Sequence, residues 1–197
     1  DLRMSRGLGD VYKRQGRRMA EFLWIFWSFS LLGWVLERLF AAVTRSPRRR
    51  RRCLLVLPFC PVYGLGMAAV LALPPNLGSG WPLYIWGCLT ATAVEYIYHW
   101  WGETFLGVPF WDYTGVFGNL RGRVCLPFSL AWGLLLFPAV YLVTPPVVAL
   151  ANRVPIGVTW WLLLAFTADA VCSLRFLAVT HDLEALRAVI WPVSADR

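Results

Sequence analysis

Charged residues are scarce in this sequence. Asp, Glu, Lys and Arg make up 15% of its 197 residues, whereas about a quarter is usual for a soluble domain with a hydrated surface. The hydrophobic share is 58%, and twelve residues are Trp. This deficit of charge predicts an integral membrane protein and argues against a soluble catalytic domain.

Several motifs are also absent. The sequence has no GxxxxGK[ST] phosphate-binding loop, which excludes nucleotide hydrolysis by that route, and no GxSxG nucleophile motif. Its five cysteines are scattered without a CxxC pair, so neither a disulfide framework nor a zinc site is indicated. We find no internal repeat of the kind that inverted-repeat transporters show. Because the sequence shows no nucleotide-binding loop and no cysteine-based metal site, we expect no cofactor.

The basic residues flank the apolar stretches. The net charge is +8, but an arginine run at 48–52 lies between two such stretches. In membrane proteins this distribution sets orientation. We therefore expect the lipid bilayer as the partner, and no nucleic acid.

Five apolar stretches are long enough to be considered as spans, since a bilayer core needs roughly 20 residues of helix. The class predicted is all-α, a polytopic bundle of about five transmembrane helices with an interfacial or re-entrant segment between helices three and four, near Trp111. Pro58 and Pro61 predict an extended or kinked start for the second span. The predicted spans are 20–44, 53–73, 81–101, 124–143 and 156–180, with 144–155 as a connection.

Three regions follow from composition. Residues 1–18 are expected to be a non-native or disordered N-terminal arm, with Met19 as the start; a native basic arm is the alternative. Residues 19–180 form the transmembrane domain and 181–197 a cytoplasmic tail. Because arginines concentrate in the loop at 45–52, we expect this loop and the segment 102–123 inside the cell, and the turn at 74–80 outside.

Five ionisable side chains lie at membrane depth, where charge is costly and usually faces a bundle interior or a wet cavity. Glu37 shares a helical stripe with Ser30 and Gly33. Asp169 is either protonated, paired with an arginine such as Arg38, or lining a polar cavity. The five are Glu37, Arg38, Glu95, His99 and Asp169.

Glu95, His99 and Glu103 follow i, i+4, i+8 spacing on one helix face. They are either weak candidates for a metal or proton site, or hydrogen-bonded residues that join the helix to its neighbours. The first and third lie about 12 Å apart along the axis at about 1.5 Å per residue, so one ion reaches two of them unless another helix contributes.

Six short segments in order resemble the family of small bacterial membrane proteins described as putative ABC-transporter type IV, or putative ABC transporter permease. The resemblance covers about 22–135, and the arginine run at 48–52 departs from the glycine-containing turn expected there. The segments are GWVLE (33–37), LPFCPVYGLG (57–66), EY (95–96), FWDYT (110–114), NLRGRVCL (119–126) and AWG (131–133).

The resemblance implies a multi-pass inner-membrane protein with a transport role. We expect a permease-like subunit that lacks its own ATPase and works with a separate ATPase subunit or as a homo-oligomer. The alternatives are a membrane-embedded metal enzyme acting on a lipid or isoprenoid, and a non-catalytic scaffold. The predicted binding cluster consists of Glu37, Arg38, Tyr63, Glu95, Trp111, Asp112, Tyr113, Asn119, Arg121 and Arg123. Within it, Asp112 is expected to pair with Arg121 or Arg123.

Overall fold

The computed structural model describes residues 2–44 and 53–190, and the predicted arginine loop at 45–52 lies outside them. Within the described residues the fold is helical, and its only β feature is the isolated bridge between Leu120 and Val124. The elements are α1 (Leu2–Thr44), α2 (Pro61–Leu71), α3 (Pro82–Trp101), the π-helix η2 (Gly102–Leu106), α4 (Leu126–Pro138), the π-helix η3 (Ala139–Val143), α5 (Thr144–Arg153), α6 (Ile156–Thr180) and α7 (Leu183–Ile190).

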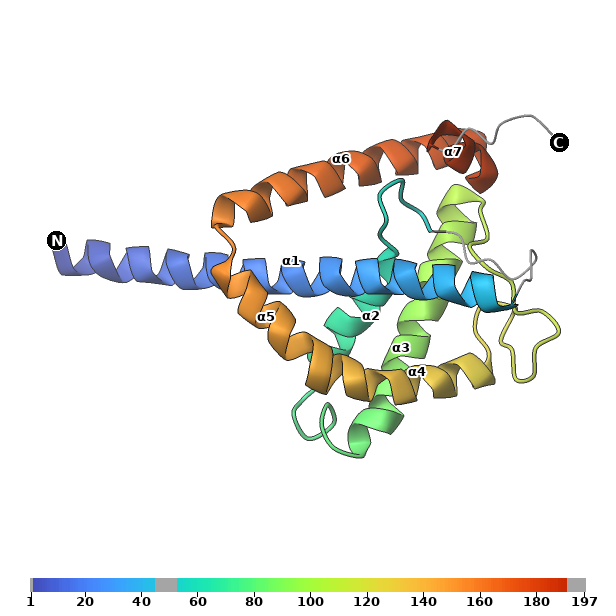
Figure 1. Ribbon diagram of the computed structural model, residues 1–197, viewed down its shortest axis with the longest axis horizontal. Coiled ribbons are helices and arrows are strands. Elements are labelled where there is room, and N and C mark those ends of the chain that lie inside the picture. Colours follow the sequence, from blue (N-terminus) through green and yellow to red (C-terminus); the bar gives the residue numbers. More distant parts are fainter. Residues whose placement is uncertain (1, 45–52, 191–197) are drawn as a thin grey trace.

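The long helix α1 organises the arrangement. It packs against α2 and α5, while α3 packs against α2 and α4. In Figure 1, α6 runs along the upper side of the molecule, the bent α4–α5 rod lies below α1, and the first turns of α3 extend beyond that rod. The backbone of the predicted N-terminal arm is helical from Leu2 and continues into the first span without a break.

Three of the five predicted spans are both long and apolar enough to cross a bilayer among the described residues. They are Gln15–Thr44, Leu126–Arg153 and Ile156–Thr180. The helix of the predicted second span, α2, has 11 residues, or roughly 16 Å at 1.5 Å per residue, about half of a bilayer core. Helix α3 has 20 residues and is long enough to cross a bilayer core, but it is not one of the three candidate spans. The structure therefore supports a membrane protein with three candidate spans.

The expected connection at 144–155 is wrong, because α5 occupies most of it. Helices α4, η3 and α5 join into one rod with Pro138, Pro145 and Pro146 inside. Proline in the first turn of α5 is tolerated since few N–H groups there have a helical partner. In η3 the backbone hydrogen bonds join residues five apart, and in this way the Thr144 N–H donates to the carbonyl of Ala139.

The start of the second span agrees with its prolines. Residues 53–60 are non-helical, and α2 begins at Pro61, as the fixed φ of proline favours. The Cys60 N–H donates to the Ser30 carbonyl at 2.9 Å, which fastens the segment to α1. This places the side chains of α2 directly against the polar stripe of α1.

The segment 107–125 between η2 and α4 is irregular and lies beside the C-terminal end of α1 (Figure 1). Gly107, Gly115, Gly118 and Gly122 all have positive φ, as does Arg121 at 54°. Trp111 and Tyr113 are nevertheless buried. The segment folds back onto the bundle, and its depth in the bilayer stays a prediction.

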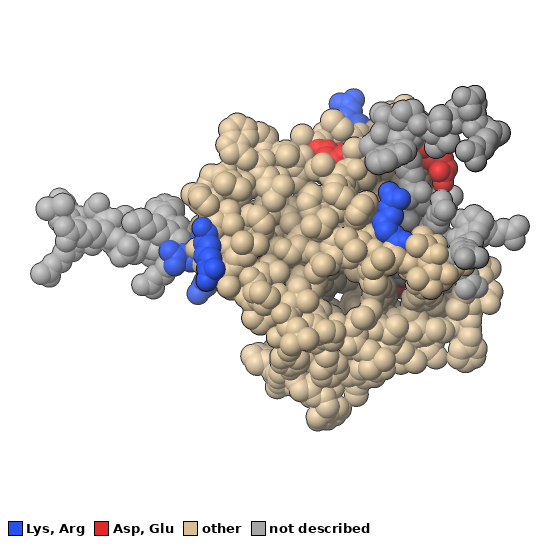
Figure 2. All heavy atoms as spheres, in the orientation of Figure 1, with Lys and Arg blue, Asp and Glu red and all other residues tan. Residues whose placement is uncertain are grey.

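Charged side chains are unevenly spread on the face drawn in Figure 2. They lie at the left end of the body and along its upper and right parts, and a broad area over α4 and α5 carries none. Lipid contact is the natural environment for an uncharged surface of exposed Leu, Val and Trp side chains.

Candidate functional site

Glu95 is the best buried carboxylate of the structure's described part, with 3% of its surface exposed. Its Oε1 accepts a hydrogen bond from the Tyr113 hydroxyl at 3.1 Å, and its Oε2 accepts one from Trp132 Nε1 at 3.0 Å. These donors come from the segment 107–125 and from α4, while Glu95 is on α3. The two hydrogen bonds offset part of the cost of burying a carboxylate.

Glu37 lies half-buried on α1 and accepts a hydrogen bond from the Tyr63 hydroxyl of α2. The Tyr63 ring occupies the space beside Gly33, where any Cβ would overlap it. The predicted stripe of Ser30, Gly33 and Glu37 therefore faces α2. Glycine is needed at position 33 because the aromatic ring passes directly over the helix backbone.

Tyr63 and Trp132 connect the two carboxylates. Their ring centroids are 5.3 Å apart and their planes meet at 85°, an edge-to-face pair. Tyr63 donates to Glu37 and Trp132 donates to Glu95. We call these two rings the aromatic pair. Glu37 and Glu95 were expected to face each other or a shared cavity; each has a polar partner, but they line two neighbouring cavities.

One cavity, which we call the apolar cavity, has a volume of about 340 Å³. It lies among α1, α2, α3 and the α4–η3 rod, and most of its lining is aliphatic. Glu95 is the charged side chain that reaches it among the described residues, and both rings of the aromatic pair lie on its wall. Its size is at the lower end of the range for small-molecule sites.

The other cavity, which we call the aromatic cavity, has a volume of about 240 Å³ and lies toward the segment 107–125. Glu37 and Asp112 line it. The two cavities share the aromatic pair together with Leu36 and Leu135. Six aromatic side chains also line it: Phe40, Tyr63, Trp111, Tyr113, Phe128 and Trp132.

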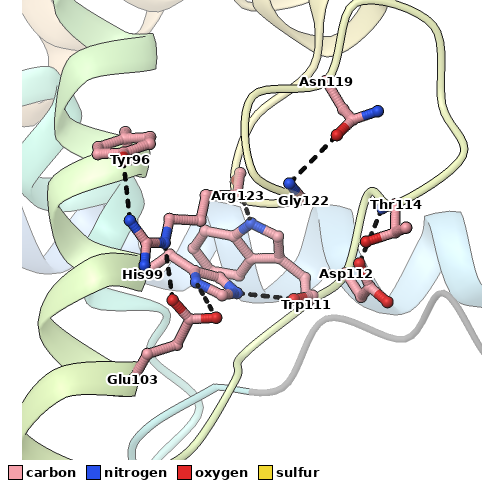
Figure 3. A network of polar contacts seen from close by, with 9 residues as sticks. All are labelled: Tyr96, His99, Glu103, Trp111, Asp112, Thr114, Asn119, Gly122 and Arg123. Carbon is pink, nitrogen blue, oxygen red and sulfur yellow. Dashed lines mark hydrogen bonds and ion pairs between the residues drawn. The ribbon is translucent and has the colours of Figure 1, made fainter.

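Arg123 holds the segment 107–125 against α3 (Figure 3). Its Nε donates to Glu103 at 2.7 Å, and its Nη1 donates to the Tyr96 hydroxyl at 2.8 Å. The Glu103 carboxylate raises the pKa of the guanidinium further above its usual value. Asp112 was expected to pair with Arg121 or Arg123, but Arg123 pairs with Glu103, and among the described residues Asp112 forms no ion pair with either arginine.

Asp112 instead accepts the Thr114 N–H at 2.8 Å and closes a local turn. Asn119 has a similar local role, since its Oδ1 accepts the Gly122 N–H at 3.2 Å (Figure 3). Arg121 is exposed, and Arg38 is exposed with its guanidinium 5.0 Å above the Trp34 ring. Asn119, Arg38 and Arg121 therefore lie outside both cavities.

The three metal candidates are not gathered around one point. Nε2 of His99 lies 2.7 Å from the Trp111 carbonyl, and its Nδ1 is 3.5 Å from Glu103 without the alignment of a hydrogen bond. Glu103 turns to Arg123, while Glu95 turns to Tyr113 and Trp132. Among residues 2–44 and 53–190, no group of three or more His, Cys, Asp or Glu side chains could hold a metal ion.

Comparison with known families decides the relationship. The family model described as "Putative ABC-transporter type IV" matches residues 24–174. The chain belongs to this family. A search of curated proteins and one of solved structures found no match.

The match to the type IV family covers both carboxylates and the aromatic pair. The resemblance noted in the sequence over 22–135 thus extends through most of α6. The family description gives a transport class and names no solute.

Two contacts of this type IV family member were missed in the sequence. Trp132 belongs to the AWG segment but not to the predicted binding cluster. Its indole N–H lies in an apolar helix and needs an acceptor, and this need could have pointed to a carboxylate partner. Asp169 accepts the N–H groups of Val56 and Leu57 at 3.2 and 2.9 Å, and the Ser173 hydroxyl at 3.1 Å. No local pattern linked α6 to the segment 53–60.

Proposed function

We propose that this membrane protein is a permease-like subunit of a transport system, and that a separate ATPase subunit supplies the energy. One observation carries the proposal: two cavities meet at the aromatic pair, and each has a carboxylate at that boundary. A solute that moves between the cavities must displace the two rings. Tyr63 and Trp132 would thus form a gate, and Glu37 and Glu95 would be the polar positions on its two sides.

The family relationship and the sequence support the same assignment. The family description refers to ABC transport, and the sequence lacks a phosphate-binding loop of its own. Three candidate spans enclose little volume by themselves, so we propose that a second copy or a partner subunit completes the path. We place the complex in the inner membrane of a bacterial cell.

Transport into membrane vesicles tests the proposal. Inside-out and right-side-out vesicles from cells that overproduce the chain and its ATPase would be incubated with ATP and a deproteinised cell extract. Mass spectrometry of the vesicle contents should identify at least one solute that accumulates with the unaltered chain and not with Glu95→Gln. Gly157→Leu is the control, because a Cβ added at Gly157 of α6 would meet nothing within 4 Å. Equal accumulation in empty-vector vesicles and in vesicles with the chain would refute the permease role.

A further inference from the structure

The apolar cavity runs from the surface of α1 to the centre of the bundle. Leu32, Val35 and Leu39 of α1 line it, and their side chains are 45%, 40% and 59% exposed. We call this exposed border the mouth. Met67 of α2 and Leu136 of α4 line it as well, and these are only 3% and 8% exposed. They form what we call the floor, so a ligand that enters at the mouth can reach side chains buried inside the bundle.

The mouth lies between α1 and α4. Within the described residues α1 packs closely against α2 and α5, and α4 against α3, but α1 and α4 are not among the closely packed pairs. Their contact lies at the end toward the segment 107–125, where Phe40 and Phe128 meet edge-on with 5.9 Å between the ring centroids. In Figure 2 the surface is hollowed between the places that α1 and the α4–α5 rod have in Figure 1. The two helices therefore leave a lateral opening.

The opening faces hydrocarbon. Both helices that flank it belong to candidate spans, Gln15–Thr44 and Leu126–Arg153. Leu32, Val35 and Leu39 lie well inside the first of these spans, and apolar side chains exposed at this depth contact acyl chains. The cavity is thus reached from the bilayer and not from water.

The lining of the apolar cavity has little to offer a water-soluble solute. Its polar side chains among the described residues are Tyr63, Glu95 and Trp132, and the rest are apolar. These three are already engaged, since Tyr63 donates to Glu37, and Trp132 and Tyr113 donate to Glu95. A polar solute would lose its hydration here without gaining equal partners. A cavity lined by aliphatic side chains stays free of water and accepts apolar ligands.

We propose that a hydrocarbon chain of a membrane lipid enters the apolar cavity sideways from the bilayer, and that the substrate of the permease-like subunit belongs to this lipid class. The head group stays outside the mouth, because the lining provides no partner for it. The chain lies on one side of the aromatic pair, so the gate remains closed while the substrate binds. This inference rests on the proposed function, since it names the substrate class and the side of entry for the same path.

Photolabelling in vesicles tests the inference. The purified full chain would be reconstituted in phosphatidylcholine vesicles with a trace of phosphatidylcholine that carries a diazirine in the middle of one acyl chain. After irradiation, mass spectrometry of peptides maps the adducts. We expect adducts on Met67 at the floor of the cavity and on Leu164 of α6, which is 59% exposed and serves as the reference. A phosphatidylcholine with the diazirine on its head group should leave Met67 unlabelled.

A variant that fills the cavity gives the second comparison. Gly66 lines the cavity and a Cβ there would meet nothing within 4 Å, so Gly66→Leu occupies the space without a clash. It should lower the adduct on Met67, relative to that on Leu164, about tenfold, which corresponds to about 1.4 kcal/mol of lost binding. Gly157→Leu adds the same side chain on α6, where a Cβ also meets nothing within 4 Å, and should leave the ratio unchanged. The comparison of the two probes uses the unaltered chain and decides even where Gly66→Leu does not fold.

Absence of an adduct on Met67, equal labelling of Met67 by the two probes, or a ratio that a folded Gly66→Leu leaves unchanged would overturn the inference. The vesicle transport experiment separates it from the proposed function. The solute that accumulates there should carry a long hydrocarbon chain, and a water-soluble one would keep the permease role and overturn the lipid substrate. Labelling of Met67 as expected, with vesicles that accumulate nothing, would refute the permease role and leave the lipid site standing.

Discussion

At the scale of single residues, the burial of Glu95 depends on two donors from different elements. Tyr113 and Trp132 each present a buried polar hydrogen that has this carboxylate as its acceptor. Leaving a buried donor without an acceptor costs about 1–3 kcal/mol. Glu95 thus ties α3 to both α4 and the segment 107–125.

We therefore expect Glu95→Ala to be the more damaging of two substitutions. Alanine strands both donors and should lower the stability of the detergent-solubilised protein by about 2–5 kcal/mol, seen as a lower midpoint of thermal unfolding. Glu95→Gln keeps an oxygen for the Trp132 N–H and an amide that can donate to the Tyr113 oxygen, and it should cost less than half as much. Equal midpoints for the two variants would contradict this account.

Asp112 provides a pH-dependent contact. The hydroxyl and the backbone N–H of Thr114 hold the pKa of the Asp112 carboxyl below its usual value of 3.8. The folded pKa is lower than the unfolded one, so the turn is fully stabilised above the unfolded pKa and loses this contribution as pH falls through the folded pKa. Carbonyl NMR of Asp112 should show a midpoint below 3.8, and Thr114→Val should move it upward. A midpoint unchanged by this substitution would exclude the hydroxyl as a cause.

The sequence showed which polar residues lie within apolar helices, and much less about what their side chains contact. The stripe of Ser30, Gly33 and Glu37 followed from helical periodicity alone. The donors of Glu95 come from positions 18 and 37 residues away, and no periodicity encodes contacts between separate elements. The same holds for the metal candidates, because Arg123, 20 residues on, engages the Glu103 carboxylate, and Tyr113 and Trp132 engage that of Glu95.

At the scale of elements, α1 and α2 are brought together by glycine. A Cβ at Gly64 would overlap the Phe26 carbonyl and the Ser30 hydroxyl, whereas a Cβ on Gly66 of the same helix would meet nothing within 4 Å. Small residues at helix contacts let backbones approach closely in membranes. The two glycines of α2 thus form a matched pair for experiment.

Gly64→Ala should destabilise the protein by about 1–3 kcal/mol, because the extra methyl group forces the helices apart. Gly66→Ala should be neutral or stabilise it by up to about 1 kcal/mol, since alanine favours the helix. Thermal unfolding in detergent measures both. A loss of stability in Gly66→Ala as large as that in Gly64→Ala would show that the glycines serve flexibility and not close packing.

Element boundaries were predicted well where one signal dominates. Helix α6 runs over Ile156–Thr180, the predicted range, because Pro155 precedes it and His181 ends it in the left-handed conformation. An element boundary was predicted wrongly where prolines are compatible both with a loop and with the first turn of a helix. The connection expected at 144–155 is instead mostly helix, because Pro145 and Pro146 lie in the first turn of α5 after a π-helical turn, where prolines are tolerated.

At the scale of the whole molecule, orientation in the membrane is the main prediction. The end of α1 and the segment 107–125 lie at the same end of the molecule (Figure 1). The predicted topology puts that end in the cytoplasm and the turn between α2 and α3 outside. In a cysteine-free background, Ser79→Cys should react with an impermeant thiol reagent added to intact cells. Asn119→Cys should react only after the cells are opened. The reverse pattern would invert the topology.

Asp169 has a further consequence for how the chain assembles during synthesis. Its partners Val56 and Leu57 precede it by 113 and 112 residues. At about 5–20 residues per second, a ribosome needs roughly 6–23 s to cover that distance. Throughout this interval the amide groups of Val56 and Leu57 must be satisfied by water or by other partners. The segment 53–60 thus obtains two of its hydrogen-bond acceptors only from α6, and a chain stalled before residue 169 would lack both of them.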